Sequence, residues 1–236
     1  MALPRVNDTL NFNMKIPSTG KRVKYRPYLV KEEKVLLQAF ESGDLKSCLE
    51  AIIDTLDACV HDKVDVSSLA TFDVEYMFTQ IRARSVGETS NVTVNCKSCN
   101  HANPYQVNIE ELKVEVKDFD NIVKVTDDIS VEIKYPTYEG LMRGDLEKLK
   151  EEDTDSVLQI IASSIGAVMT QDERIDCSTL KMEEVLDFLN SMTAPQLRLV
   201  SESLTTMPAL EHNGEFDCEE CGVKNEVNLK GLADFF

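Results

Sequence analysis

The first thirty residues alternate apolar and polar side chains, as extended backbone does. Two such runs flank residues 17–20, Pro-Ser-Thr-Gly, which form a turn sequence, and Pro27 separates them from the segment that follows. The pattern predicts a hairpin or a long extended arm, and we define residues 1–30 as an extended N-terminal arm. The alternating apolar positions are Met14, Ile16, Val23 and Tyr25.

Between residues 31 and 90 the apolar residues recur at the spacing of amphipathic helices. One helix ends at Gly43, a second runs from about residue 45 to 60, and a third begins near Asp73, which we place as its N-cap. The sequence therefore predicts a helical block over residues 31–90. Its apolar stripes are Val35, Leu36, Leu37 and Phe40, then Leu49, Ile52, Ile53, Leu56 and Val60, then Val74, Met77, Phe78 and Ile81.

Residues 111–206 are expected to form an inserted unit that combines a β-hairpin with a second helical block. A period of two predicts short strands at its start, and helical spacing follows. Thr193 is the expected cap of the last helix, with Pro195 in its first turn. The expected strands cover residues 114–116, 122–125 and 129–135, and the expected helices cover residues 137–150, 154–169, 180–191 and 194–206.

Two cysteine segments repeat each other on either side of this insert. The first reads V-N-C-K-S-C-N-H-A-N followed by V-N-I-E-E-L, and the second reads F-D-C-E-E-C-G-V-K-N followed by V-N-L-K-G-L. Each has an Asn four residues after its second Cys, and each lies in strand-like sequence. We expect an α+β fold in which helical blocks are combined with β-hairpins and a split zinc ribbon, whose two knuckles cover residues 91–110 and 207–231.

The four cysteines of these segments are the strongest chemical signal in the chain. Two Cys-x-x-Cys turns can direct four thiolates at one point and complete a tetrahedral zinc site without an open coordination position, so the zinc would be structural. Reduced, metal-free turns and an iron–sulfur cluster are the alternatives, and His101 or His212 could replace a cysteine. The predicted ligands are Cys96, Cys99, Cys218 and Cys221.

The remaining cysteines give no such pattern. Cys48 and Cys59 fall in expected helices, where a small buried side chain is typical, and Cys177 is expected to take no part in the site. The extreme C-terminus adds an apolar cluster of Leu232, Phe235 and Phe236. We expect this cluster to be buried, either against the knuckle hairpins or against a partner.

Charge separates the N-terminal segment from the rest of the chain. The formal net charge is −17, whereas residues 1–35 hold eight Lys or Arg and only three acidic residues. The acidic remainder opposes binding to nucleic acid phosphates. A basic arm suits docking onto an acidic partner or a neighbouring copy, as an added strand; the alternative is that it packs on its own helices. The candidate partner-binding residues are Lys21, Arg22, Lys24, Tyr25, Arg26 and Tyr28.

Catalytic and targeting signals are missing from the sequence. Residues 18–21 lack the earlier Gly and the final Ser or Thr of a phosphate-binding loop, and no nucleophile–base motif occurs. No apolar run approaches the ~18 residues of a membrane helix, and the N-terminus lacks the apolar run of a signal peptide. The sequence therefore predicts a non-enzymatic protein of a reducing cytoplasm.

Two segments are similar to a known family. Residues 17–34, PSTGKRVKYRPYLVKEEK, and residues 73–88, DVEYMFTQIRARSVGE, resemble the baseplate proteins of T4-like contractile-tailed bacteriophages. The resemblance implies a component or assembly factor of the central baseplate hub, made in the cytoplasm of the infected bacterium, with other baseplate hub proteins as partners. It leaves open whether the chain stays in the tail baseplate of the virion.

A zinc-ribbon adaptor in transcription or translation is the alternative function, since many zinc ribbons bind nucleic acid. Glu219 and Glu220, between the second pair of cysteines, oppose phosphate binding.

Overall fold

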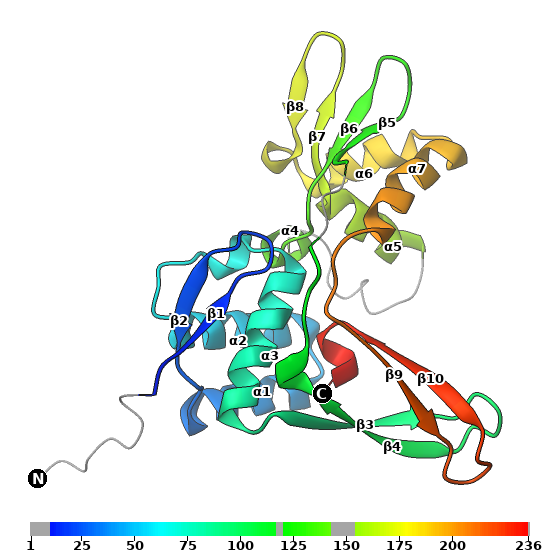
Figure 1. The fold of residues 1–236 in the computed structure, drawn as a ribbon. Helices are drawn as coiled ribbons and strands as arrows, with labels where there is room; N and C mark the ends of the chain where they lie inside the picture. The colour runs from blue at the N-terminus through cyan, green and yellow to red at the C-terminus, as the bar shows by residue number, and fades with distance from the viewer. Residues whose placement is uncertain (1–9, 117–119, 143–153, 236) are drawn as a thin grey trace, which may run out of the picture.

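The computed structural model describes residues 10–116, 120–142 and 154–235 (Figure 1). They form an α+β fold with small antiparallel sheets, which confirms the expected class. The helices are α1 (Val30–Ser42), α2 (Leu45–Cys59), α3 (Thr71–Ser85), α4 (Tyr138–Met142), α5 (Thr154–Ser163), α6 (Met182–Asn190) and α7 (Ala194–Thr205). The strands are β1 (Phe12–Lys15), β2 (Arg22–Tyr25), β3 (Thr89–Asn95), β4 (Ala102–Asn108), β5 (Ile122–Lys124), β6 (Ser130–Ile133), β7 (Ile165–Met169), β8 (Arg174–Asp176), β9 (Glu211–Asp217) and β10 (Lys224–Lys230).

The strands form three separate hairpins and one sheet. β1–β2, β3–β4 and β9–β10 are two-stranded, and β5–β6–β7–β8 form a four-stranded antiparallel sheet. Hairpins β3–β4 and β9–β10 extend together from one side of the helical region, and the four-stranded sheet stands at the far end with α5, α6 and α7 against it (Figure 1). The division of the chain at residues 30, 90, 110 and 206 stays a prediction.

The first helices follow their sequence signals closely. Gly43 adopts φ 66°, a left-handed conformation that ends α1, and the Asp44 carboxylate then caps α2 by accepting the N–H of Ser47 at 2.9 Å. The N-cap assigned to α3 is wrong. The N-cap of that helix is Ala70, three residues earlier, and the buried Asp73 carboxylate accepts the N–H of Ser18 at 2.9 Å, together with its hydroxyl.

The N-terminal segment is not a free extended arm over its described part. β1 and β2 form a hairpin whose inner face is buried against α1, α2 and α3, so of the two predicted forms the hairpin is confirmed and the extended arm is wrong there. The reason is apolar burial, since alternate residues supply one wholly apolar face. Residues 1–9 of the expected arm lie outside the described residues. The buried side chains are Met14, Ile16, Val23 and Tyr25, each no more than 6% exposed.

The inserted unit differs from its prediction in two places. The helix expected over residues 154–169 ends at Ser163, and its second half is β7, which pairs with both β6 and β8. Residues 114–116 form no strand, although Val114 packs against buried neighbours. Helix α4 covers the start of the helix expected over residues 137–150, and residues 143–150 lie outside the described part. α6 and α7 confirm the last two helices, and Gln196 accepts the N–H and hydroxyl of Thr193.

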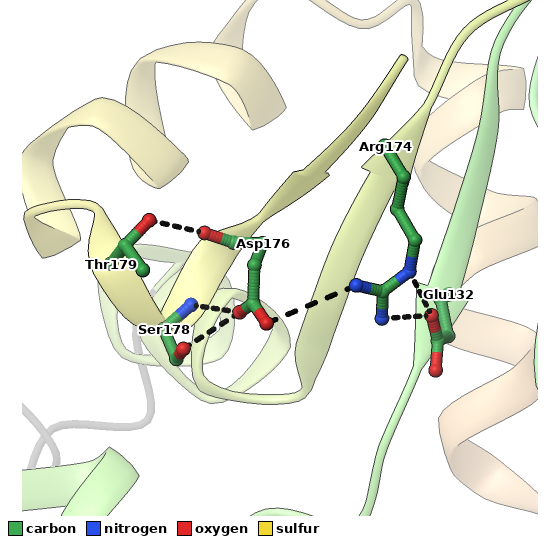
Figure 2. A network of polar contacts seen from close by, with 5 residues as sticks. All are labelled: Glu132, Arg174, Asp176, Ser178 and Thr179. Carbon is green, nitrogen blue, oxygen red and sulfur yellow. Dashed lines mark hydrogen bonds and ion pairs between the residues drawn. The ribbon is translucent and has the colours of Figure 1, made fainter.

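A polar network ties the edge strand β8 to the inner strand β6 (Figure 2). The guanidinium of Arg174 on β8 reaches over β7 and donates to Glu132 on β6, with an Nη2–Oε2 distance of 2.6 Å, and it lies 3.9 Å from Asp176. Asp176 in turn accepts the N–H and hydroxyl of Ser178 at 2.8 and 2.7 Å. Because Arg174 and Asp176 are exposed and Glu132 is only half-buried, the ion pairs add little to stability, and we assign the network to holding the sheet edge.

The C-terminal turn covers the β3–β4 and β9–β10 hairpins. Phe235 is fully buried among apolar residues of both hairpins, and its carbonyl accepts the Ser90 hydroxyl. The expected internal burial is therefore confirmed for Phe235, whereas Leu232 is only partly buried and Phe236 lies outside the described residues. The buried members of this hairpin cluster are Ala83, Val107, Ile109, Leu112, Leu210, Val227, Leu229 and Phe235.

We expect Phe235→Ala to destabilise the isolated protein by about 3–5 kcal/mol, because it leaves a cavity in the hairpin cluster. Leu199→Ala is the control, since Leu199 is 46% exposed. Thermal or denaturant unfolding measures both variants. Equal stabilities of Phe235→Ala and Leu199→Ala would contradict the internal packing of Phe235.

Glu75 on α3 connects the C-terminal turn to the helices. Its carboxylate accepts the backbone N–H of Leu232, and burial raises its pKa from 4.5 to about 7. A carboxyl whose pKa is raised by folding contributes stability below its unfolded pKa, and that contribution is lost as the pH rises through the folded pKa. Ionisation of Glu75 between pH 4.5 and 7 therefore lowers the free energy of unfolding by roughly 3 kcal/mol, since each pKa unit corresponds to about 1.4 kcal/mol.

Glu75→Gln is consequently expected to stabilise the protein relative to wild type at pH 7 and above. Gln keeps the acceptor for Leu232 but cannot ionise. The difference in unfolding free energy between the two proteins should grow from pH 4.5 to pH 7, as measured by denaturant titration at each pH. A difference that stays constant over this range would mean that Glu75 does not titrate as described.

Candidate metal centre

The structure brings the four predicted cysteines to one point. Cys96 and Cys99 lie in the turn between β3 and β4, and Cys218 and Cys221 lie in the turn between β9 and β10. The Sγ atoms of Cys96 and Cys221 are 3.7 Å apart, those of Cys99 and Cys218 are 3.6 Å apart, and all four lie within 4.8 Å of one another. A tetrahedral zinc with Zn–S bonds of ~2.3 Å would place its sulfurs ~3.8 Å apart. The donor set and its spacing therefore fit a Cys₄ metal, whose binding stays a prediction.

The two turns have the same backbone hydrogen bonds. In each, the N–H of the first cysteine donates to the carbonyl five residues further on, at 2.9 Å for Cys96 and 3.0 Å for Cys218. The N–H four residues further on donates back to the first cysteine at 2.9 Å. That fourth residue is Asn100 in one turn and Gly222 in the other, with φ of 58° and 68°. Gly and Asn are the residues that tolerate this left-handed conformation best, which explains their shared position.

The Asn repeated in both segments braces each turn against the other. Asn103 Oδ1 accepts the N–H of Glu219 in the second turn, and Asn225 Oδ1 accepts the N–H of Lys97 in the first, both at 2.9 Å. Asn225 Nδ2 also donates to Cys96 Sγ at 3.4 Å. Both Asn side chains are buried. The role of these two residues was not predicted from the sequence, although their equal spacing after the cysteines was the available signal.

We expect Asn225→Ala to weaken metal binding about 10- to 100-fold, the range seen when an outer partner of a metal ligand is removed. The change removes a donor to Cys96 and the acceptor for Lys97. Asn228→Ala is the matched control, because Asn228 lies on the exposed face of the same strand. Competition with a chromophoric chelator measures the affinities. Identical affinities in the two variants would show that the bracing does not support the site.

Hydrogen bonds favour thiolates at the site, and crowding opposes them. Backbone N–H groups three and two residues further on lower the pKa of Cys96 and of Cys218. Cys99 and Cys221 keep raised pKa values although backbone N–H groups also point at them, because burial and the neighbouring sulfurs oppose further negative charge. A bound cation would remove this opposition.

The other candidate ligands lie apart from the four sulfurs. His212 Nε2 contacts the hydroxyl of Tyr105 at 2.9 Å, and neither His212 nor His101 belongs to the metal-competent group found in the described residues. Cys59 and Cys177 are buried, and the Cys48 thiol donates to a backbone carbonyl at 3.3 Å. Burial raises the pKa of Cys59 to about 11, which keeps it a neutral thiol.

Of the six candidate partner-binding residues, three are exposed and three are engaged within the chain. Lys21, Arg22 and Lys24 are exposed on the β1–β2 hairpin. Tyr25 is only 3% exposed, and Arg26 forms an ion pair with Glu32 at 2.8 Å. Tyr28 is half-buried, and its N–H donates to Ser85. Lys15, which is not among the six predicted residues, lies on the exposed face opposite Arg22. Period-two alternation along β1 was the signal for it.

Comparison with known protein families matches the chain to a family model. Residues 9–236, nearly the whole chain, match the sequence model of a family described as T4 bacteriophage base plate protein. No curated protein and no solved structure matches the chain. Within the described residues, no helix is both long and apolar enough to cross a membrane.

Proposed function

The chain belongs to the T4 bacteriophage base plate protein family, and we propose that it is a non-enzymatic structural or assembly subunit of the central hub of the baseplate. The observation that carries this proposal is the family match over residues 9–236, which includes both cysteine turns. The architecture supports it, since small hairpins with exposed faces and edges offer surfaces for ordered assembly. The protein would be made in the cytoplasm of the infected bacterium and act there during assembly of the tail.

The Cys₄ group would hold a structural zinc ion as a split zinc ribbon. Four soft thiolate donors suit zinc, and they leave no position for a substrate or an activated water. The ligands come from two hairpins that are distant in sequence, so the metal would fix β3–β4 against β9–β10. The residues that would hold it are Cys96, Cys99, Cys218 and Cys221.

The exposed face of the β1–β2 hairpin would contact a partner in the assembly. Its cationic side chains are Lys15, Lys21, Arg22 and Lys24. Among the described residues none of the four forms an ion pair, so their charge is available to an acidic surface. This face replaces the original set of six, because Tyr25 and Arg26 are engaged within the chain.

Purification of the tagged full chain from phage-infected cells tests the proposal. Mass spectrometry should identify other baseplate hub proteins among those retained, and mild washing at low salt should preserve them. Recovery of ribosomal or RNA polymerase subunits instead, with salt-dependent nucleic acid binding by the pure protein, would support the zinc-ribbon adaptor. Retention of tail proteins from outside the baseplate would exclude the hub assignment.

A further inference from the structure

Two hairpins of this chain carry in-register pairs of like charge on their exposed faces. On β1–β2, Lys15 lies directly opposite Arg22. On β9–β10, Glu215 lies directly opposite Glu226. All four side chains are exposed. Like charges at directly opposite positions destabilise an antiparallel pair, where opposite charges would stabilise it. The chain thus contains one unfavourable cationic pair and one unfavourable anionic pair.

Neighbouring groups within the chain compensate these charges only in part. Glu215 has an ion pair with Lys224 at 2.5 Å. The other three side chains have no ion pair in the described part of the chain. Asp62 lies at the margin of the cationic face, where its carboxylate accepts the backbone N–H of Lys24 at 2.6 Å. Each pair would therefore gain from a partner surface of opposite sign.

Each face as a whole has the sign of its central pair, although outside that pair Glu211 and Asp217 of β9–β10 are balanced by Lys224 and Lys230. The exposed strand positions of β1–β2 carry cations and one Asn, with no acidic residue. Those of β9–β10 carry four acids against two lysines, and Glu219 and Glu220 follow in the turn. The exposed positions are Asn13, Lys15, Arg22 and Lys24 on the first hairpin, and Glu211, Asn213, Glu215, Asp217, Lys224, Glu226, Asn228 and Lys230 on the second.

The two faces match in geometry as well as in sign. Each central pair spans one antiparallel ladder, so the Cβ atoms within each pair have the same separation of ~4.5–5.5 Å. Two cations can therefore meet two carboxylates one to one. The inner face of each hairpin packs on its own chain, which leaves the charged faces pointing outward. The hairpins lie on opposite sides of the molecule (Figure 1), so one chain cannot join its own two faces.

We propose that the partner of the cationic β1–β2 face is the anionic β9–β10 face of a second copy of this chain. This inference rests on the proposed role in assembly and identifies the partner of that face. The contact joins two different surfaces, so it is heterologous, and repeated contacts of this kind either close into a ring or extend as a filament. The net charge of −17 repels copies at long range, but at about 0.15 M salt that repulsion is screened beyond about 8 Å. Contacting charge pairs are screened less.

Sedimentation of the pure full-length protein tests the inference. The mean mass should rise with protein concentration at about 0.15 M salt and fall to that of one chain at about 1 M, where the Debye length is about 3 Å. The charge reversals K15E/R22E and E215K/E226K should each abolish association. An equimolar mixture of these two variants should recover it, because each then supplies the face that the other lacks.

The controls separate docking from folding and from bulk charge. K34E/K46E changes the net charge as much as K15E/R22E does, at exposed positions of α1 and α2, and should associate like wild type. Both hairpin variants should keep the thermal midpoint of wild type. A wild-type protein that stays monomeric, or a mixture that does not recover association, would overturn the inference. If K15E/R22E loses association but E215K/E226K does not, the cationic face binds a surface other than the β9–β10 hairpin, and the inference is wrong. Capture of hub proteins by a monomeric wild-type chain would leave the proposed function standing.

Discussion

Cys218→Ser is expected to abolish stoichiometric metal binding and to release both cysteine turns, not only the mutated one. All four sulfurs lie within 4.8 Å of one another, so one ion would link the two hairpins. Structural zinc contributes roughly 10–16 kcal/mol of apparent binding free energy in zinc-finger peptides, which is comparable to the stability of a whole domain. Loss of the ion should therefore unfold the β3–β4 and β9–β10 hairpins, while the helices around α3 keep a separate apolar core.

Elemental analysis and hydrogen exchange measure the two parts of this prediction. Wild type should contain about one zinc per chain, and the variant should contain none. Exchange should accelerate in both hairpins and remain slow in α2 and α3. Cys48→Ser is the matched control, because Cys48 lies in α2, outside the sulfur cluster. Wild-type protein that carries iron, or no metal at all, would contradict the zinc assignment.

The cysteine site was predictable from sequence because its information is local and repeated. Each turn needs only Cys-x-x-Cys followed by a residue that tolerates positive φ, and Asn100 and Gly222 provide it. The pairing of the two turns followed from the demand of a metal for four donors. The reciprocal bonds of Asn103 and Asn225 were not predictable in the same way, because each joins one turn to a backbone N–H of the other. The repeat shows that both cysteine segments have this Asn, but it does not show what the Asn side chain contacts.

The errors in the fold arise where a non-local partner decides the structure. Residues 165–169, Ile-Gly-Ala-Val-Met, are a short apolar run that fits a buried strand or the end of a helix equally well. Pairing with β6 on one side and β8 on the other makes them a strand. Asp73 has the sequence context of an N-cap, yet it is buried and binds Ser18, fifty-five positions earlier. Neither the strand pairing of residues 165–169 nor the contact between Asp73 and Ser18 can be read from the local sequence pattern.

The position of the N-terminal hairpin could not be predicted from local sequence either, and it decides how the function of the hairpin can be tested. Its charge suited an arm that docks onto an acidic partner or a neighbouring copy, with packing on its own helices as the alternative. Its period-two pattern also specified a buried apolar face, but whether that face meets this chain or a partner depends on tertiary packing. The structure places it on α1, α2 and α3. Function at this hairpin therefore has to be tested by changing exposed charges, because truncation would remove part of the core.

Deletion of residues 1–25 is accordingly expected to unfold the helical region. The deletion removes four buried apolar side chains, and burying each contributes about 1.5–3 kcal/mol, so the total is comparable to the stability of the whole domain. It also leaves the buried Asp73 carboxylate without its two donors from Ser18.

Two point variants test the same packing. Ile16→Ala, at a position 1% exposed, should lower the free energy of unfolding by about 2–5 kcal/mol. Its exposed neighbour Lys15, changed to Glu, should cost nothing, because it then faces Arg22 with opposite charge. Denaturant unfolding followed by circular dichroism measures all three. If the truncated protein unfolds cooperatively with wild-type stability, the hairpin is not part of the core, and its apolar face contacts a partner instead.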